Sequence, residues 1–271
     1  MCGICGKFGF EQNASVSRSL IAGMLDTIRH RGPDDQGIYL APGLGLGHAR
    51  LSIIDLASGH QPLANENDSI WIVFNGEIYN YQELRRFLLE KGHVFKTQSD
   101  TEVIVHLYEE LGPKCVEKLR GMFAFALWDQ NKKTLMLARD RVGIKPLYYS
   151  LTENAIVFAS EIKAILADPE VSRDLAPEII DRFLTFLYVP GQETLLRGIQ
   201  KLAPGHYLVV KDGDAEVRCY WDLHFSKPAQ FPTLKDAEEE LLRLLAESVE
   251  LHMIADVPVG APPVDGVPVG R

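Results

Sequence analysis

Four closely spaced segments between residues 121 and 159 constrain the fold more than any other part of the chain. Residues 122–128, 134–139, 147–150 and 155–159 are rich in apolar and aromatic side chains, and polar loops separate them. Their runs are apolar throughout rather than alternating with polar residues, which predicts antiparallel strands buried on both faces. Residues 70–74 form another such run, and apolar helical stripes occupy 16–28, 81–91 and 103–111. The sequence therefore predicts layered sheets covered by outer helices.

The composition narrows the classes of partner. The chain has 271 residues, 46% hydrophobic and 24% charged, with a formal net charge of −9. This acidic balance gives no basic footprint for nucleic acid or an anionic membrane. No apolar run approaches the ~18 residues of a membrane span, and no signal peptide precedes the first strand. Four cysteines do not suggest a disulfide scaffold, so we predict a cytoplasmic protein with free thiols.

The first six residues, Met-Cys-Gly-Ile-Cys-Gly, carry a candidate nucleophile. If Met1 is removed, Cys2 presents a thiol with a pKa near ~8.5 beside an α-amine with a pKa near ~7.7–8.0. An N-terminal nucleophile activated by its own amine is suited to amide chemistry. Two other interpretations stay open from these residues alone. Cys2 and Cys5 also fit a redox pair or half a zinc site, and a buried, inert cysteine is common.

Asn75 and Gly76 follow directly after the buried run 70–74. An Asn-Gly pair is normally a turn signal. The alternative interpretation is an oxyanion hole, because a side-chain amide and an unobstructed backbone N–H lie next to each other at the end of a strand. Asn80 and Glu83 predict a capping box for the helix that follows.

Two further charged residues, Arg50 and Asp100, can be interpreted either as ligand-binding residues or as ordinary structural residues. Arg50 lies in an apolar stretch, where a guanidinium either binds a carboxylate in bidentate fashion or lies on the surface. Asp100 lies between Ser99 and Glu102, a second predicted capping box, at a turn where a carboxylate could bind a ligand ammonium.

Several motifs in order resemble the N-terminal glutaminase domain of class II glutamine amidotransferases, and most closely that of glutamine-dependent asparagine synthetases. The resemblance covers residues 1 to about 260. It rests on the N-terminal hexapeptide and on residues 30–34, 50–55, 75–80, 99–102, 139–149 and 158–163.

The resemblance implies an α+β fold of the N-terminal-nucleophile (Ntn) hydrolase type, a four-layer α/β/β/α sandwich of two antiparallel sheets. It implies hydrolysis of L-glutamine to glutamate and ammonia without a metal or cofactor. Cys2 resembles the nucleophile, and Asn75 and Gly76 resemble the oxyanion hole. The glutamine-binding residues implied by the resemblance are Arg50 for the α-carboxylate, Asp100 for the α-ammonium, and Ile53, Ile54 and Glu77 as further contacts.

The C-terminal part departs from the family pattern. We predict a glutaminase domain over 1–210, a linker with the first helix of a truncated synthetase domain over 211–255, and a flexible tail over 256–271. Residues 256–261 resemble the start of the synthetase domain, but Pro262 and Pro263 stand where its ATP-binding loop should begin. ATP and Mg are therefore expected only for the missing half, which a separate partner chain could supply.

Two alternatives remain at this point. One is an amidotransferase domain that serves another acceptor, such as a sugar phosphate or phosphoribosyl pyrophosphate. The other is a truncated, non-catalytic interaction module. The sequence leaves open whether the chain forms a homo-oligomer and whether Met1 is removed.

Overall fold

The computed structural model describes residues 1–11, 14–56, 58–225, 231–257 and 260. Two six-stranded sheets form its centre, and every strand pairing in them is antiparallel. The first sheet has the order β10-β8-β9-β1-β3-β2, and the second has the order β12-β11-β7-β6-β5-β4. The strands of the first sheet are β1 (Gly3–Gly9), β2 (Asp35–Ala41), β3 (Leu44–Arg50), β8 (Tyr148–Leu151), β9 (Ala155–Ala159) and β10 (Ile199–Lys201). Those of the second are β4 (Leu63–Ala64), β5 (Ile70–Ile78), β6 (Gly121–Asp129), β7 (Thr134–Arg139), β11 (His206–Lys211) and β12 (Asp214–Cys219).

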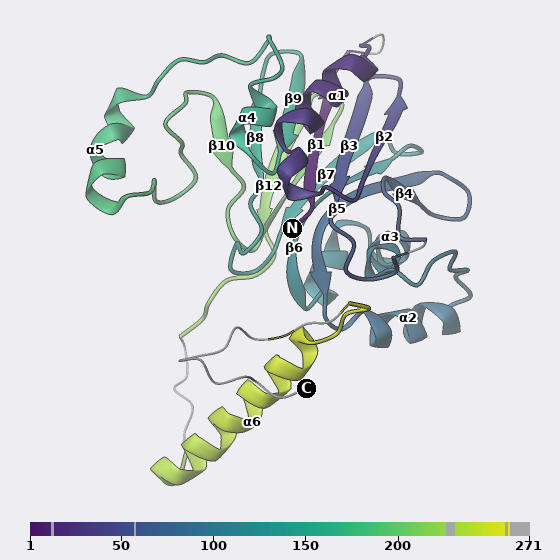
Figure 1. Ribbon diagram of the computed structural model, residues 1–271, viewed down its shortest axis with the longest axis vertical. Helices are drawn as coiled ribbons and strands as arrows, with labels where there is room; N and C mark the ends of the chain where they lie inside the picture. The colour runs from purple at the N-terminus through teal and green to yellow at the C-terminus, as the bar shows by residue number, and fades with distance from the viewer. Residues whose placement is uncertain (12–13, 57, 226–230, 258–259, 261–271) are drawn as a thin grey trace.

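Helices cover the outer faces of both sheets (Figure 1). One apolar cluster joins the first sheet to α1 (Arg18–Thr27) and α4 (Ile162–Ile165), and another joins the second sheet to α2 (Tyr81–Glu90) and α3 (Asp100–Leu111). A third cluster lies between the sheets and includes Ile4 of β1 and Val73 of β5. The predicted four-layer α/β/β/α sandwich is confirmed.

Strand β6 shows why apolar and polar residues do not alternate along the predicted strands. Phe123 and Phe125 pack toward α3, whereas Ala124, Ala126 and Trp128 pack toward the other sheet. Odd and even positions therefore enter two different cores, and both sets must be apolar.

Edge strand β2 was not among the predicted strands. Its residues are mostly half-exposed, so it lacks the continuous apolar run that marks the central strands. The hairpin β11–β12 closes around Asp212 and Gly213 as predicted, and both turn residues have a positive φ. This hairpin crosses residue 210, so the predicted domain boundary falls inside a pair of hydrogen-bonded strands.

The two predicted capping boxes are wrong in detail. The Asn80 side chain does not cap α2, because it accepts from the Arg120 N–H at 2.9 Å and donates to the Lys118 carbonyl at 3.0 Å. The Ser99 hydroxyl does cap α3. The Glu102 carboxylate, however, accepts from the backbone N–H groups of Lys96 and Thr97 instead of closing a box.

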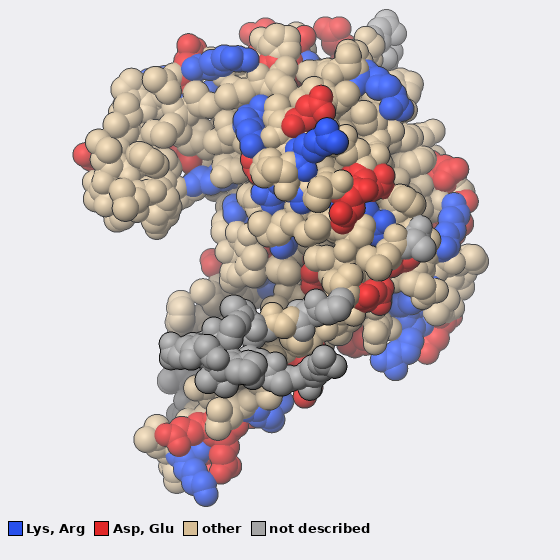
Figure 2. All heavy atoms as spheres, in the orientation of Figure 1, with Lys and Arg blue, Asp and Glu red and all other residues tan. Residues whose placement is uncertain are grey.

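The helix α6 (Leu234–His252) extends away from the sheets (Figure 1). A capping box between Thr233 and Asp236 starts it, and none of its residues is buried. Its leucines at 241, 242, 244 and 245 are all about half exposed or more. The predicted flexible tail lies almost entirely outside the described residues. No helix in the described part of the chain is long and apolar enough to cross a membrane. Acidic and basic side chains are interspersed on the face shown in Figure 2.

Candidate active site

All eight residues predicted for the site line one cavity of about 180 Å³. Three structural layers contribute to it. Cys2 directly precedes β1, and Arg50 ends the neighbouring strand β3. Asn75, Gly76 and Glu77 lie in β5 of the facing sheet, while Asp100 begins α3. Ile53 and Ile54 complete the set from the loop after β3. The sheets thus bring together residues that are up to 98 positions apart (Cys2 to Asp100).

Cys2 is fixed at the mouth of β1 by two neighbours. Its Sγ accepts from the Leu51 N–H at 3.4 Å, because β1 and β3 pair in a register that joins Gly3 to Ala49. The Arg31 Nε donates to the Cys2 carbonyl at 2.9 Å, and Arg31 is itself paired with Glu161. Burial raises the pKa of the Cys2 thiol, while the Leu51 hydrogen bond and the nearby positive charges oppose that shift.

Met1 also lines the cavity and carries the terminal amine of the described chain. Its sulfur lies 3.3 Å from Lys145 Nζ. Removal of Met1 would free the α-amine of Cys2 and remove one of the residues that line the cavity. Burial lowers the pKa of the amine on Met1, which favours the neutral, proton-accepting form.

Cys5 belongs to the core and not to the cavity. It is fully buried against α1, and burial raises the pKa of its thiol far above the ordinary value. All four cysteines are free, and none belongs to a potential metal-binding group among the described residues.

Asn75 lines the same cavity as Cys2 with a side chain that is 1% exposed. Among the described residues its Nδ2 has no hydrogen-bond partner. A buried amide N–H normally has an acceptor, so this group can donate to a molecule that enters the cavity.

The Gly76 N–H is directed toward the same cavity by strand geometry. Alternate N–H groups of a strand point to the same edge. On the edge of β5 away from β6, the Phe74 N–H donates to Gln61 Oε1 at 2.7 Å and the Ile78 N–H donates to Asp100 Oδ2 at 2.8 Å. The Gly76 N–H lies between these two bonds. A side chain at this position would be excluded, since a Cβ would lie 2.2 Å from the Met122 carbonyl oxygen.

Arg50 is 4% exposed and held by the loop that follows it. Its Nη2 donates to the carbonyls of Ile54 at 3.2 Å and Asp55 at 2.6 Å. Within the described part of the chain, the Arg50 guanidinium makes no other hydrogen bond. Its remaining N–H groups are therefore available to a carboxylate. Gly59 is required beside it, because a Cβ there would lie 2.5 Å from Nη2.

Asp100 and Glu77 add two carboxyl groups to the lining of the cavity. Burial, with a smaller contribution from Glu77, raises the pKa of Asp100 to about 7. Burial also raises the pKa of Glu77, and the Lys145 ammonium opposes that shift. A bound ammonium would restore the charged form of Asp100. The cavity therefore offers cationic donors near Arg50 and a carboxylate at Asp100, which matches an α-amino acid.

Several residues that line the cavity were not predicted for the site, among them Gln61 and Lys145. Gln61 bridges the layers by accepting from Phe74 N–H and donating to Thr101 Oγ1 at 3.3 Å. No local sequence signal marks it. Lys145 is 5% exposed and belongs to a loop organised by Asp140, whose carboxylate accepts from the N–H groups of Ile144 and Lys145 at 2.9 Å each. Lys145 lies within residues 139–149, one of the family motifs, and that motif could have identified it.

Two facing antiparallel sheets between helices, with a cysteine at the mouth of a central strand, define an N-terminal-nucleophile amidotransferase architecture. The chain belongs to the glutamine amidotransferase domain family, whose model matches residues 1–221.

Curated relatives agree with this assignment. The chain is 41% identical over 267 residues to asparagine synthetase [glutamine-hydrolyzing] 1 of Bacillus subtilis, covering 96% of this chain and 41% of that protein. It is 37% identical over 262 residues to asparagine synthetase B [glutamine-hydrolyzing] of Escherichia coli, covering 96% and 42%. The chain thus spans about two fifths of the length of these relatives. Among solved structures, the glutamine phosphoribosylpyrophosphate amidotransferase of B. subtilis has the same fold, with a TM-score of 0.58 at 21% identity, covering 81% of this chain and 49% of that one.

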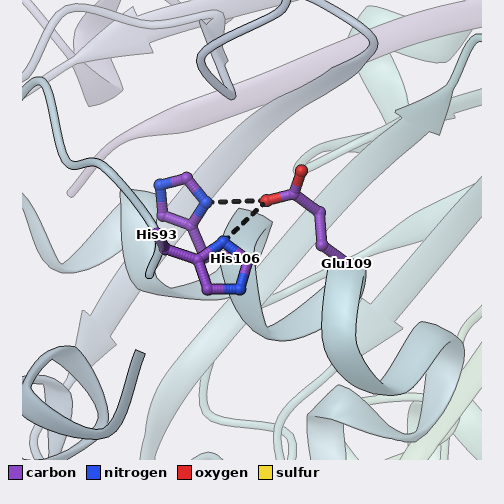
Figure 3. A group of neighbouring side chains, drawn as sticks. All are labelled: His93, His106 and Glu109. Atoms are coloured by element: carbon purple, nitrogen blue, oxygen red, sulfur yellow. Dashed lines mark hydrogen bonds and ion pairs between the residues drawn. The ribbon is translucent and has the colours of Figure 1, made fainter. Parts of the chain in front are cut away.

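A separate polar cluster joins His106 and Glu109 of α3 to His93 in the segment between α2 and α3 (Figure 3). His93, His106 and Glu109 have ligand atoms within 4.8 Å of one another. However, His106 Nδ1 lies 2.7 Å from Glu109, and the acceptors Glu102 and Glu109 raise the pKa of His106 to about 9. A protonated imidazole has no free lone pair for a metal. We interpret this cluster as an ion-pair network.

Raising the pH is expected to destabilise the chain through His106. Its pKa is about 9 in the folded state and 6.5 ordinarily, so the stabilisation is complete below pH 6.5 and is lost as the pH rises through about 9. The full contribution is at most ~3 kcal/mol. Urea unfolding should show that the free energy of unfolding falls less between pH 7 and pH 10 for His106→Gln than for wild type. Exposed His60→Gln should behave like wild type. Equal losses in wild type and His106→Gln would contradict this interpretation.

Proposed function

We propose that this chain hydrolyses the side-chain amide of L-glutamine to glutamate and ammonia. The observation that supports the proposal is that Cys2, Asn75, Gly76, Arg50 and Asp100 line one cavity, with the Asn75 Nδ2 unpaired among the described residues. Its relatives are glutamine-hydrolysing asparagine synthetases, so the ammonia would serve asparagine synthesis.

In the proposed reaction, Cys2 without Met1 passes its thiol proton to its own α-amine. The thiolate then attacks the side-chain amide carbon, a C–S bond forms, and the resulting oxyanion is bound by Asn75 Nδ2 and the Gly76 N–H. The amine returns the proton to the leaving nitrogen, the C–N bond breaks, and ammonia departs. Water then attacks the thioester, which releases glutamate and restores the thiol. Arg50 and Asp100 orient the substrate, with Glu77 and the backbone of Ile53 and Ile54 beside it.

This half of the reaction would use no metal or cofactor. ATP and Mg would be needed only by the half that activates the acceptor, and this could be supplied by a separate synthetase-domain partner. A cytoplasmic, reducing environment would keep Cys2 as the free thiol that the reaction requires. An acceptor other than aspartate is the second candidate, since the phosphoribosylpyrophosphate amidotransferase has this fold, but identity at 21% supports the fold alone.

The proposal is tested by intact mass and by glutamate release from L-glutamine on the same preparation. We expect a mass without Met1 and glutamate in equal amount to ammonia. L-Asparagine, one methylene shorter, should react poorly because its amide cannot reach Cys2 while its α-groups engage Arg50 and Asp100. A preparation without Met1 that binds glutamine but releases no ammonia would support the non-catalytic alternative.

A further inference from the structure

The segment that follows α6 returns to the rim of the cavity. The His252 ring packs on Tyr79 with centroids 4.1 Å apart, next to the part of β5 that carries Glu77 and Ile78. A further contact lies earlier on α6, where Glu247 pairs with Arg120 at 3.2 Å. The helix itself buries none of its residues, so these contacts fix only its C-terminal half to the sheets (Figure 1).

Asp256 then makes two hydrogen bonds to the loop after β3. Its backbone N–H donates to the Ile53 carbonyl at 3.0 Å, and its Oδ2 accepts from the Asp55 N–H at 2.7 Å. The two bonds bracket Ile54 on both sides. A residue 201 positions away in sequence therefore holds the loop that lines the cavity.

This loop is also what positions Arg50. The carbonyls of Ile54 and Asp55 accept from Arg50 Nη2. Asp55 has φ 51°, a left-handed conformation that costs a non-glycine residue ~1 kcal/mol or more. Other contacts that hold Asp55 are made by its carboxylate, which accepts from Ser58 and from the Gln98 N–H at 2.8 Å. The Asp256 carboxylate adds the contact to the Asp55 N–H itself.

We infer that Asp256 is a positioning residue for glutamine recognition: by fixing Ile53 to Asp55 it orients Arg50 toward the substrate α-carboxylate. This inference rests on the proposed function. The resemblance to asparagine synthetases places the start of the second domain at Asp256. Glutamine affinity is therefore coupled to the segment that leads into the acceptor half, and by linkage glutamine binding acts on that segment in return.

Asp256→Ala is expected to raise the KM for glutamine about tenfold with kcat within about twofold, because it removes one hydrogen bond that affects binding but not the reacting atoms. Asp256→Asn keeps an oxygen that can accept from the Asp55 N–H, so its KM should return to within about twofold of wild type. Glu250→Ala, an exposed carboxylate at the end of α6, is the matched control and should leave KM unchanged.

Calorimetric titration of L-glutamine into Cys2→Ala chains, with and without Asp256→Ala, separates this inference from the proposed function. Turnover by the wild type tests the proposed function, whereas the change in Kd tests the role of Asp256 without turnover. A tenfold weaker Kd, restored by Asp256→Asn, is the expected result. An unchanged Kd and KM in Asp256→Ala would overturn the inference, as would an equal weakening in Asp256→Asn and Asp256→Ala.

Discussion

Replacing Cys2 with alanine is expected to abolish glutamate release, with a fall in kcat of at least ~10⁴-fold. The thiolate is the atom that would bond to the amide carbon, and no other free thiol reaches the cavity, since Cys5 and Cys115 are buried in the cores and Cys219 is exposed on β12. The substitution removes one sulfur atom and its long hydrogen bonds to Leu51, whereas the backbone pairing of β1 with β3 does not depend on it. Thermal unfolding should therefore stay close to wild type.

Glutamate release and intact mass should be measured together for this variant, since alanine at position 2 also permits removal of Met1. Cys219→Ala is the matched control and should retain wild-type kcat. Activity that survives in Cys2→Ala would exclude the proposed mechanism. Activity lost equally in Cys219→Ala would point to general damage rather than a missing nucleophile.

Replacing Asn75 with alanine is expected to lower kcat by ~10²–10³-fold with a much smaller change in KM. Its Nδ2 would bind the oxygen of the tetrahedral intermediate more strongly than the amide of bound glutamine, and such a donor contributes mainly to the transition state. Because this nitrogen has no partner in the described part of the chain, its removal breaks no hydrogen bond seen there. The free energy of unfolding should change by less than about 1 kcal/mol.

Steady-state kinetics and urea unfolding on the same preparations would check both parts of this expectation. Asn131→Ala, in the exposed turn between β6 and β7, is the control and should be silent in both measurements. A wild-type kcat in Asn75→Ala would show that Asn75 does not contribute to the oxyanion hole. A large loss of stability would indicate that its role is structural.

The sequence predicted the core because its strands have strong local signatures, whereas the roles of the polar site residues came from the family resemblance. Central strands such as β6 are apolar on both faces, and Arg50 ends β3. The strand predicted to end at Phe74 continues to Ile78, so Asn75 and Gly76 lie within β5 and not in a turn. Edge strand β2 and the bridging residue Gln61 have no comparable signature, since one is half-exposed and the other acts only through distant partners. Asn80 followed a local capping rule, but contacts to Lys118 and Arg120 prevailed.

The roles of the eight predicted residues stay predictions, although one cavity contains all of them. The position of Asp256 against Asp55 could not be foreseen, because a contact across 201 residues leaves no periodic pattern in the sequence.

The short strand β4 has a consequence for what this protein can bind. It pairs only with Ile72 and Trp71, so the rest of β5 has an open edge. Open edges invite other chains to add a strand. Here Gln61 and Asp100 occupy the N–H groups of Phe74 and Ile78, which leaves a single donor at Gly76. A polypeptide needs a series of donors to extend a sheet, whereas one carbonyl oxygen needs only one. We therefore expect Gln61 and Asp100, which cover the N–H groups on both sides of Gly76, to disfavour addition of a strand at this edge.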